Sequence, residues 1–518
     1  MGDAQLYSVV AVLLVSVATV VVGAFGLRMS RTTSDFYVAS RAVSPRWNAS
    51  AIGGEYLSAA SFLGVAGLVL VAGTDMLWFP VGYTTGYLVL LVLVAAPLRR
   101  SGAYTLPDFA EGRLESREVR RAASVLVVGI GWLYLVPQLQ GAGIALRAVT
   151  GAPVWMGAAI VATVVVLNVV AGGMRSITFV QAFQYWLKLT AIALPMFFIL
   201  LVWHSDGAPS PATAEWLRPL GGASGRDHPL YSTYSIVLAL FFGTMGLPHV
   251  LVRFYTNPDG RAARRTTLVV IALLGVFYLF PPLYGALGRI YAADLLAVGH
   301  ADTVVLLLPE RVVPGVAGQL LSALTTAGAF AAFLSTSSGL VMSVSGVLHQ
   351  DLLSRWARPG RRGTGRRAAS PRRPESLRGF RAAAVASIVV PFVLSLFAGA
   401  LSLADTVGLA FAVAASTFCP LLVLGIWWRG LTRTGALTGL VVGGALASAA
   451  VVITMVGGTR DGWTGALLAQ PAAWTVPLAF ATMISVSLAT PRSVPPHVAR
   501  TMVRLHAPED VDVDRSSR

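Results

Sequence analysis

The chain has 518 residues, of which 55% are hydrophobic and only 12% are charged. A soluble protein usually carries about 25% charged residues, so this composition excludes an ordinary soluble domain. Apolar runs of about 20 residues recur along the whole chain and predict an all-α polytopic membrane protein. The single cysteine, Cys419, excludes a disulfide framework.

We expect thirteen membrane-spanning helices. In chain order they cover residues 6–27, 48–72, 76–98, 123–149, 154–174, 177–203, 231–252, 266–290, 315–349, 380–401, 404–428, 434–457 and 471–490. The first run begins near Asp3 and is followed by Arg28 and Arg31, which is typical of a retained helix with its N-terminus outside. Most of the 39 lysines and arginines then fall in inside loops, as the positive-inside rule requires in a cell membrane, and the C-terminus is cytoplasmic.

The predicted organisation has two five-helix repeats at its centre, residues 48–203 and 231–428. Around them we expect a peripheral first helix with a cytoplasmic loop (1–47), an extracellular loop (204–230), two peripheral helices (429–490) and a poorly ordered cytoplasmic tail (491–518). A basic cytoplasmic loop at 352–379 contains "RPGRRGTGRRAASPRRP". Such a run in a membrane protein favours contact with anionic lipid over nucleic-acid binding.

Two of the predicted spans are interrupted by glycine or proline. The second contains "GGEYLSAASFLG", and we expect its interruption at Gly53 and Gly54. A carboxylate at this depth costs about 2.5–3.5 kcal/mol on insertion scales, which indicates a functional role. The seventh is interrupted at Gly243, Gly246 and Pro248. Breaks in the first helices of two five-helix repeats are typical of the midplane site of secondary transporters.

Three stretches carry a family resemblance: "GEYLSAASFLG" (54–64), "FGTMGLPHVLVRFYT" (242–256) and "VGLAFAVAAS" (407–416). They resemble the sodium:solute symporter family and, within it, the cation–acetate (monocarboxylate) branch. The resemblance implies LeuT-like inverted repeats with broken helices. It also implies sodium-driven import of a short-chain monocarboxylate, such as acetate, propionate or pyruvate, by alternating access.

The same resemblance implies a sodium site. It aligns Gly54 and Leu57 with carbonyl ligands, and it places the other ligands on the ninth span, with Asp351 as the acidic marker. These other ligands are Ala332, Ser335 and Thr336. The alternative is that the two hydroxyls bond back to the preceding helical turn. Some relatives have an acidic residue at a second cation site where this chain has Gln181, which argues against a second sodium ion.

A small carboxylate suits the N-terminus of the second half of the broken second span. The candidate substrate contacts there are Ser58, Ala60 and Ser61, with Phe242, Gly243 and Thr244 facing them, although small residues also serve plain packing. Glu55 has three candidate roles: it stabilises the unwound backbone, balances the cation or carries a proton. We favour a structural or electrostatic role. Lys188 lies close enough to the inner face to snorkel, and its role is left open.

Three alternatives remain open at this stage. The same fold could carry another solute, such as proline or another organic acid, or be driven by protons. An ion channel or a membrane sensor is a further alternative. An enzyme is disfavoured, because no helix carries a metal-ligand cluster or a nucleophile–base pair.

Overall fold

The computed structural model describes residues 2–27, 43–210, 216, 227–297, 299, 301–353, 375–397, 402–457, 461–509 and 511. Most of the basic loop predicted at 352–379 and much of the extracellular loop predicted at 204–230 lie outside the described residues. The same holds for most of the loop that follows the first helix and for the end of the tail.

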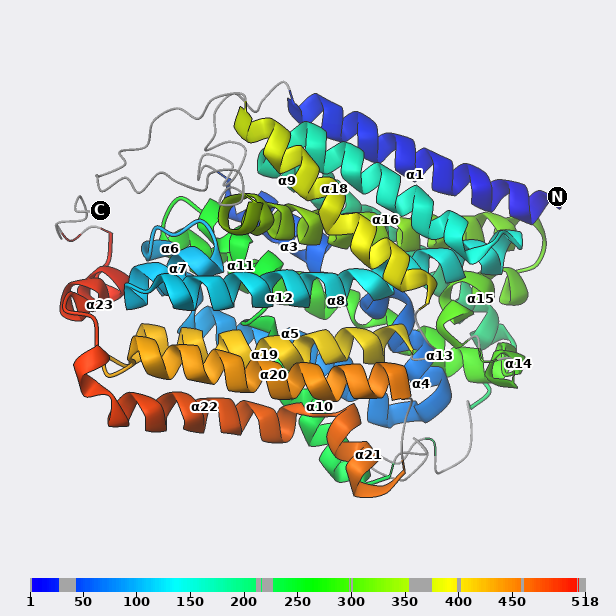
Figure 1. The fold of residues 1–518 in the computed structure, drawn as a ribbon. Helices are drawn as coiled ribbons and strands as arrows, with labels where there is room; N and C mark the ends of the chain where they lie inside the picture. Colours follow the sequence, from blue (N-terminus) through cyan, green and yellow to red (C-terminus); the bar gives the residue numbers. More distant parts are fainter. Residues whose placement is uncertain are drawn as a thin grey trace.

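The first half of the chain forms helices that run back and forth through the molecule (Figure 1). In order they are α1 (Asp3–Leu27), α3 (Pro45–Tyr56), η2 (Ala60–Gly64), α4 (Val65–Ala72), η3 (Gly73–Leu77), α5 (Trp78–Leu93), α6 (Ala95–Arg100), α7 (Leu106–Leu114), α8 (Arg117–Thr150) and α9 (Val154–Ser205). Helix α9 bends at Gly173, whose φ of 60° and ψ of −172° are not helical. The bend separates two spans, as predicted.

The second half begins with α10 (Pro229–Thr244), α11 (Pro248–Val252), η4 (Arg253–Thr256), α12 (Gly260–Phe277), α13 (Phe280–Tyr291), α14 (Asp294–Ala297), η5 (Ala301–Thr303) and α15 (Val304–Val312). It continues with α16 (Gly315–Val347), η6 (Leu348–Leu353), α18 (Glu375–Leu396), α19 (Leu403–Trp427), α20 (Arg433–Gly457), α21 (Gly462–Ala469), α22 (Ala472–Ala489), η7 (Pro491–Ser493) and α23 (Val498–His506). Helix α16 packs against α9, α8 and α1, whereas α20 and α22 pack together beside α19 (Figure 1). The buried α16 therefore lies at the centre of one half of the molecule.

The described residues contain eleven helical stretches that are long and apolar enough to cross a membrane, together with the shorter apolar helix Val154–Val170. One of the eleven, Ala60–Leu93, joins parts of two predicted spans through the turn at Gly73. The prediction of an all-helical polytopic membrane protein is confirmed, and each predicted span has a helical counterpart.

Both predicted helix breaks exist, but the first is displaced. Gly53 and Gly54 are helical, and the chain leaves the helix at Leu57 and Ser58 before η2 begins. The prediction of a break at the glycine pair is therefore wrong by about one turn. The second break falls at residues 245–247, and Pro248 starts α11, as predicted. Pro is favoured at this position because the first helical N–H has no partner within the helix.

The prediction of a poorly ordered tail is wrong for its first part. Helix α23 packs against α6, and Arg504 donates a hydrogen bond to the Ser101 carbonyl. Arg100 pairs with Glu509 at 3.3 Å. The polar composition suggested disorder, but α23 is amphipathic and its Met502 and Leu505 are buried.

Candidate functional site

The break in the second span is built around a buried lysine. Lys188, in the second half of α9, has no exposed surface. Its Nζ donates hydrogen bonds to the Gly54 carbonyl, to the Leu57 carbonyl at 2.8 Å and to Ser335 Oγ at 2.9 Å. An ammonium has three N–H donors, so these three bonds use all of them. Lys188 does not snorkel to the inner face, because the end of α3 and the middle of α16 supply acceptors at depth.

A buried ion pair lies beside the lysine. Arg253 Nε of η4 lies 2.6 Å from Glu55 Oε2 of α3, with both side chains 2% exposed or less. Arg253 also donates to Thr178 Oγ1 at 2.8 Å and to Gln181 Oε1. Gln181 Nε2 in turn donates to the Ser335 carbonyl at 2.8 Å. This pairing supports the electrostatic role favoured for Glu55.

Two glycines allow the helices to meet at this point. A Cβ on Gly339 of α16 would lie 2.0 Å from Glu55 Oε1, and a Cβ on Gly54 would lie 2.1 Å from the Gln181 carbonyl oxygen. Real Cβ atoms essentially never approach other atoms within 3.0 Å. Gly54 therefore lets α3 approach the backbone of α9, and Gly339 leaves room for the carboxylate.

The structure brings the five predicted sodium ligands into one small region. Gly54, Leu57 and Ser335 contact Lys188 Nζ, as described above. Thr336 Oγ1 donates to the Glu55 carbonyl at 2.6 Å, and the Ala332 carbonyl accepts from Ser335 Oγ at 3.0 Å. Three of the five predicted ligand oxygens thus already bind a cationic side chain.

The six candidate substrate residues lie in four different surroundings. Ser58, Ala60 and Ser61 are buried at the break, and Ser61 Oγ lies 2.7 Å from the Tyr278 hydroxyl. Thr244 Oγ1 lies 2.8 Å from the Tyr56 hydroxyl, at the other end of the same region. Gly243 faces the Phe411 carbonyl of α19. Phe242 packs instead with Ala412, Ala415 and Val476 between α10, α19 and α22.

Several buried hydrogen-bonding groups near the break have no partner among the described residues. They include the Tyr87 hydroxyl, Gln138 Nε2 and both ring nitrogens of His249. Gln138 Oε1 accepts the Ala59 N–H at 2.9 Å, which leaves its amide donors at the start of the second half-helix. Sequence reasoning missed Tyr87 and Gln138. The one available signal was that Gln138 is a polar residue within an apolar span.

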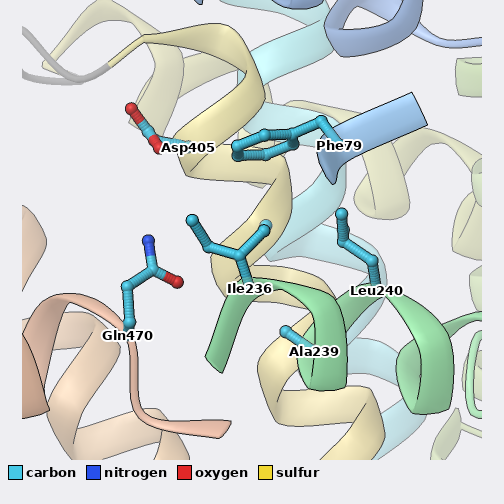
Figure 2. A pocket seen from close by; sticks show the side chains of 7 residues that line it. Phe79, Ile236, Ala239, Leu240, Asp405 and Gln470 are labelled. Carbon is cyan, nitrogen blue, oxygen red and sulfur yellow. The ribbon is translucent and has the colours of Figure 1, made fainter. Parts of the chain in front are cut away.

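A row of aromatic rings separates the break from a small hollow. The hollow is lined by Phe79, Ile236, Ala239, Leu240, Asp405, Gly408 and Gln470 (Figure 2). From Phe79 the rings continue to Tyr83 (6.2 Å between centroids), Phe411 (5.3 Å) and Tyr56 (6.1 Å). We call these four rings the aromatic layer. They occupy the space between the hollow and the end of α3 in this structure.

The fold is similar to solved secondary transporters with broken helices. A Na⁺-coupled sialic acid symporter in a substrate-bound outward-open state matches with a TM-score of 0.67 and 15% identity, over 92% of this chain and 98% of that one. A nucleobase-cation-symport-1 family transporter in a closed conformation with bromovinylhydantoin matches with a TM-score of 0.52 and 13% identity, over 92% and 99%. The protein is thus an all-helical membrane protein with a LeuT-like fold.

The sequence identifies the family more narrowly. The model of the sodium:solute symporter family matches residues 36–443, and the chain belongs to this family of transporters. It is 32% identical over 478 residues to the uncharacterized symporter YwcA of Bacillus subtilis (strain 168), covering 89% of this chain and 90% of that one. It is 31% identical over 491 residues to the monocarboxylic acid transporter of Corynebacterium glutamicum, covering 88% and 86%. The family resemblance is confirmed.

Proposed function

We propose that this protein imports a short-chain monocarboxylate, such as acetate, propionate or pyruvate, together with a cation by alternating access. Membership of the symporter family supports the transport mode, and the relative named as a monocarboxylic acid transporter supports the solute. The observation that carries the substrate class is the set of unpartnered donors around the break. Neutral donors such as the Gln138 amide and the Tyr87 hydroxyl suit a carboxylate, and a buried donor without a partner costs about 1–3 kcal/mol.

The charge balance of the site favours an anion. Lys188 and Arg253 are cationic groups and Glu55 is anionic, so these three residues leave a surplus of one positive charge. At an effective dielectric of 20, a carboxylate about 10 Å from one positive charge is attracted by roughly 1.7 kcal/mol. That is more than a tenfold gain in affinity. A bound substrate anion would bring this group to neutrality.

The driving cation has two candidates. Sodium is favoured by the family and by the five oxygen ligands that the resemblance implies. The proton is favoured by the position of Lys188.

The topology that we propose has the N-terminus outside and the C-terminus in the cytoplasm, so the hollow of Figure 2 faces outward and the aromatic layer closes the outer path.

Counterflow into proteoliposomes tests the function. Vesicles loaded with unlabelled acetate, propionate or pyruvate should accumulate the labelled acid transiently, because a carrier exchanges substrate across the membrane. Counterflow of proline or another organic acid, with none of these three, would assign a different solute. Labelled flux without counterflow would indicate a channel, and binding without flux would indicate a sensor.

Two variants test the donors. Gln138→Leu and Tyr87→Phe should each raise KM about tenfold or more, because a hydrogen bond to a charged group contributes roughly 1.5–3 kcal/mol. The matched control is Tyr284→Phe, since the Tyr284 hydroxyl is equally buried but donates to the Ile192 carbonyl at 3.0 Å. Equal effects of all three substitutions would argue against a substrate role for Gln138 and Tyr87.

A further inference from the structure

We infer that the side chain of Lys188 takes the place of the sodium ion at the predicted site, so that this protein binds its substrate without sodium there. The inference rests on the proposed function, because it concerns the cation that accompanies the monocarboxylate. Lys188 Nζ donates hydrogen bonds to the Gly54 and Leu57 carbonyls and to Ser335 Oγ. These are three of the five oxygens that the family resemblance assigns to sodium, so the residues present do not fit the ion at this position.

The two remaining predicted ligand oxygens are also engaged within the protein. The Ala332 carbonyl accepts a hydrogen bond from Ser335 Oγ at 3.0 Å, and Thr336 Oγ1 donates to the Glu55 carbonyl at 2.6 Å. A sodium ion could bind these oxygens only by displacing Nζ or by lying close to it. At an effective dielectric of 20, a like charge about 4 Å away weakens binding roughly a thousandfold.

The surroundings of Lys188 oppose its displacement by an ion. The side chain has no exposed surface, so Nζ does not reach solvent. The nearby carboxylate of Glu55 is engaged by Arg253 Nε at 2.6 Å. An ammonium that left its three acceptors would therefore stay buried without equivalent partners, which is strongly unfavourable.

The type of residue at this position agrees with the inference. The chain has 39 lysines and arginines, and Lys188 is the single lysine among them. An ammonium is a compact point charge with three rotatable donors, whereas a guanidinium is a planar fork that matches carboxylates. A lysine can therefore satisfy oxygens that converge from α3 and α16 in the way that a small cation would.

The position of the possible second cation site shows the same replacement. Gln181 stands there, its Oε1 accepts a hydrogen bond from Arg253, and its Nε2 donates to the Ser335 carbonyl at 2.8 Å. Both predicted cation positions are thus occupied by donors of the protein itself. Because these positive charges are covalently attached, they remain with the protein when the substrate leaves, and substrate affinity should not depend on sodium.

Sodium binding to the purified full chain in detergent tests the inference without transport. The wild type should show no saturable ²²Na⁺ binding, whereas Lys188→Ala should gain it and the further substitution Ser335→Ala should remove it again. Lys188→Arg is the matched control, because it keeps the charge and the bulk, and it should gain no binding. Saturable binding to the wild type that Ser335→Ala abolishes would overturn the inference, and this measurement does not require that Lys188→Ala folds.

Counterflow of labelled pyruvate separates this inference from the proposed function. Proteoliposomes are compared in sodium and in choline on both sides, with protein-free liposomes as the control for passive entry. We expect the same KM for pyruvate, within twofold, in the two media. A tenfold higher KM in choline, or counterflow in sodium alone, would overturn the inference and leave the proposed function intact. Absence of counterflow in both media would count against the proposed function, and the sodium-binding measurement would still decide the inference.

Discussion

Two ion clusters centred on arginine, both among the described residues, differ in depth. In the central cluster, Arg253 pairs with the carboxylate of Glu55, Lys188 lies beside this pair, and all three side chains are buried. In the peripheral cluster, Arg120 at the start of α8 faces three carboxylates: Asp108 at 2.8 Å, Glu111 at 2.5 Å and Asp351 at 2.7 Å. The side chains of Arg120, Asp108 and Glu111 are 16–33% exposed.

The difference shows how depth changes the roles that the same ionisable side chains can have. Water screens the peripheral cluster, so its surplus of negative charge is tolerated, and Arg120 ties α7 to η6. The central cluster cannot rely on water, and an unbalanced charge there is costly unless a partner arrives. A positive surplus that is unfavourable in the empty site becomes favourable when an anion binds. This asymmetry makes the central cluster suited to transport and the peripheral one to structure.

The largest effect is expected from separating the central ion pair. Arg253→Ala leaves Glu55 buried without its cation, and breaking a buried pair in this way costs about 3–5 kcal/mol. We expect loss of uptake together with a large drop in the thermal unfolding temperature in detergent. The double variant Glu55→Gln/Arg253→Gln removes both charges and should recover much of the stability but not the uptake. If Arg253→Ala unfolds at the wild-type temperature, the pair is not structural.

Glu55→Gln alone separates the two functions proposed for this carboxylate. Because Glu55 is held by Arg253 rather than free to exchange a proton, we expect both accumulation and substrate exchange to fall together. Loss of proton-driven accumulation with intact exchange would instead assign the coupled proton to Glu55. Uptake and counterflow measured on the same proteoliposomes distinguish the two outcomes.

A smaller effect is expected at two residues for which the sequence predicts the same role. Ser335 and Thr336 are both predicted sodium ligands, but only Ser335 contacts Lys188, whereas Thr336 donates to the Glu55 carbonyl. Ser335→Ala should change the cation dependence of uptake, because it removes an acceptor from the ammonium. Thr336→Ala should lower stability by about 1 kcal/mol and keep the wild-type cation dependence. Equal loss of sodium dependence in both variants would support the sodium site instead.

The fold and part of this site could be predicted from the sequence because they depend on local patterns. Apolar runs give the spans, and Pro248 and Gly246 mark the second break. The first break was misplaced because Gly54 serves close approach to α9 rather than unwinding. The glycine pattern alone cannot separate these two uses.

The roles of Lys188 and Arg253 could not be predicted for a different reason. Arg253 and Glu55 are 198 residues apart, and their pairing depends on how η4 meets α3. Lys188 lies near enough to the inner face for its chain to reach water, so sequence position favoured snorkelling. Only the crossing of α3, α9 and α16 shows that three acceptors converge on it. The rule that an intramembrane charge is functional, which identified Glu55, applied equally to Lys188.

In the peripheral cluster we expect small losses of stability, and these losses should be smaller for a more exposed carboxylate. Glu111 is the most exposed of the three carboxylates, at 33%, and Glu111→Gln should change stability by less than about 1 kcal/mol. Asp351 is 5% exposed and also accepts a hydrogen bond from Ser124 at 2.7 Å, so Asp351→Asn should cost more. Thermal unfolding of both variants in detergent tests this order. The reverse order would mean that depth does not govern this cluster.

The last effect concerns Asp302 of η5, a carboxylate that lies between two spans. Burial raises its pKa from 3.8 to about 6; the Leu403 N–H, 3.1 Å from Oδ2, lowers it and the charge of Asp405 raises it. Since the folded state holds the proton more tightly than the unfolded state, the stabilising contribution of Asp302 is fully present below pH 3.8. It is lost as the pH rises through about 6.

Asp302→Asn removes this titration while keeping an oxygen that can accept the Leu403 N–H. The unfolding temperature of the wild type relative to the variant should therefore fall by a few degrees as the pH rises from 3.8 to above 6. The comparison is made in one detergent, at constant ionic strength, so that other titrating groups cancel between the two proteins. A difference that stays constant over this range would mean that Asp302 is solvated like an ordinary surface carboxylate. Burial without a cationic partner would then not be the cause of its behaviour, and the contrast between deep and shallow charges would not extend to this loop.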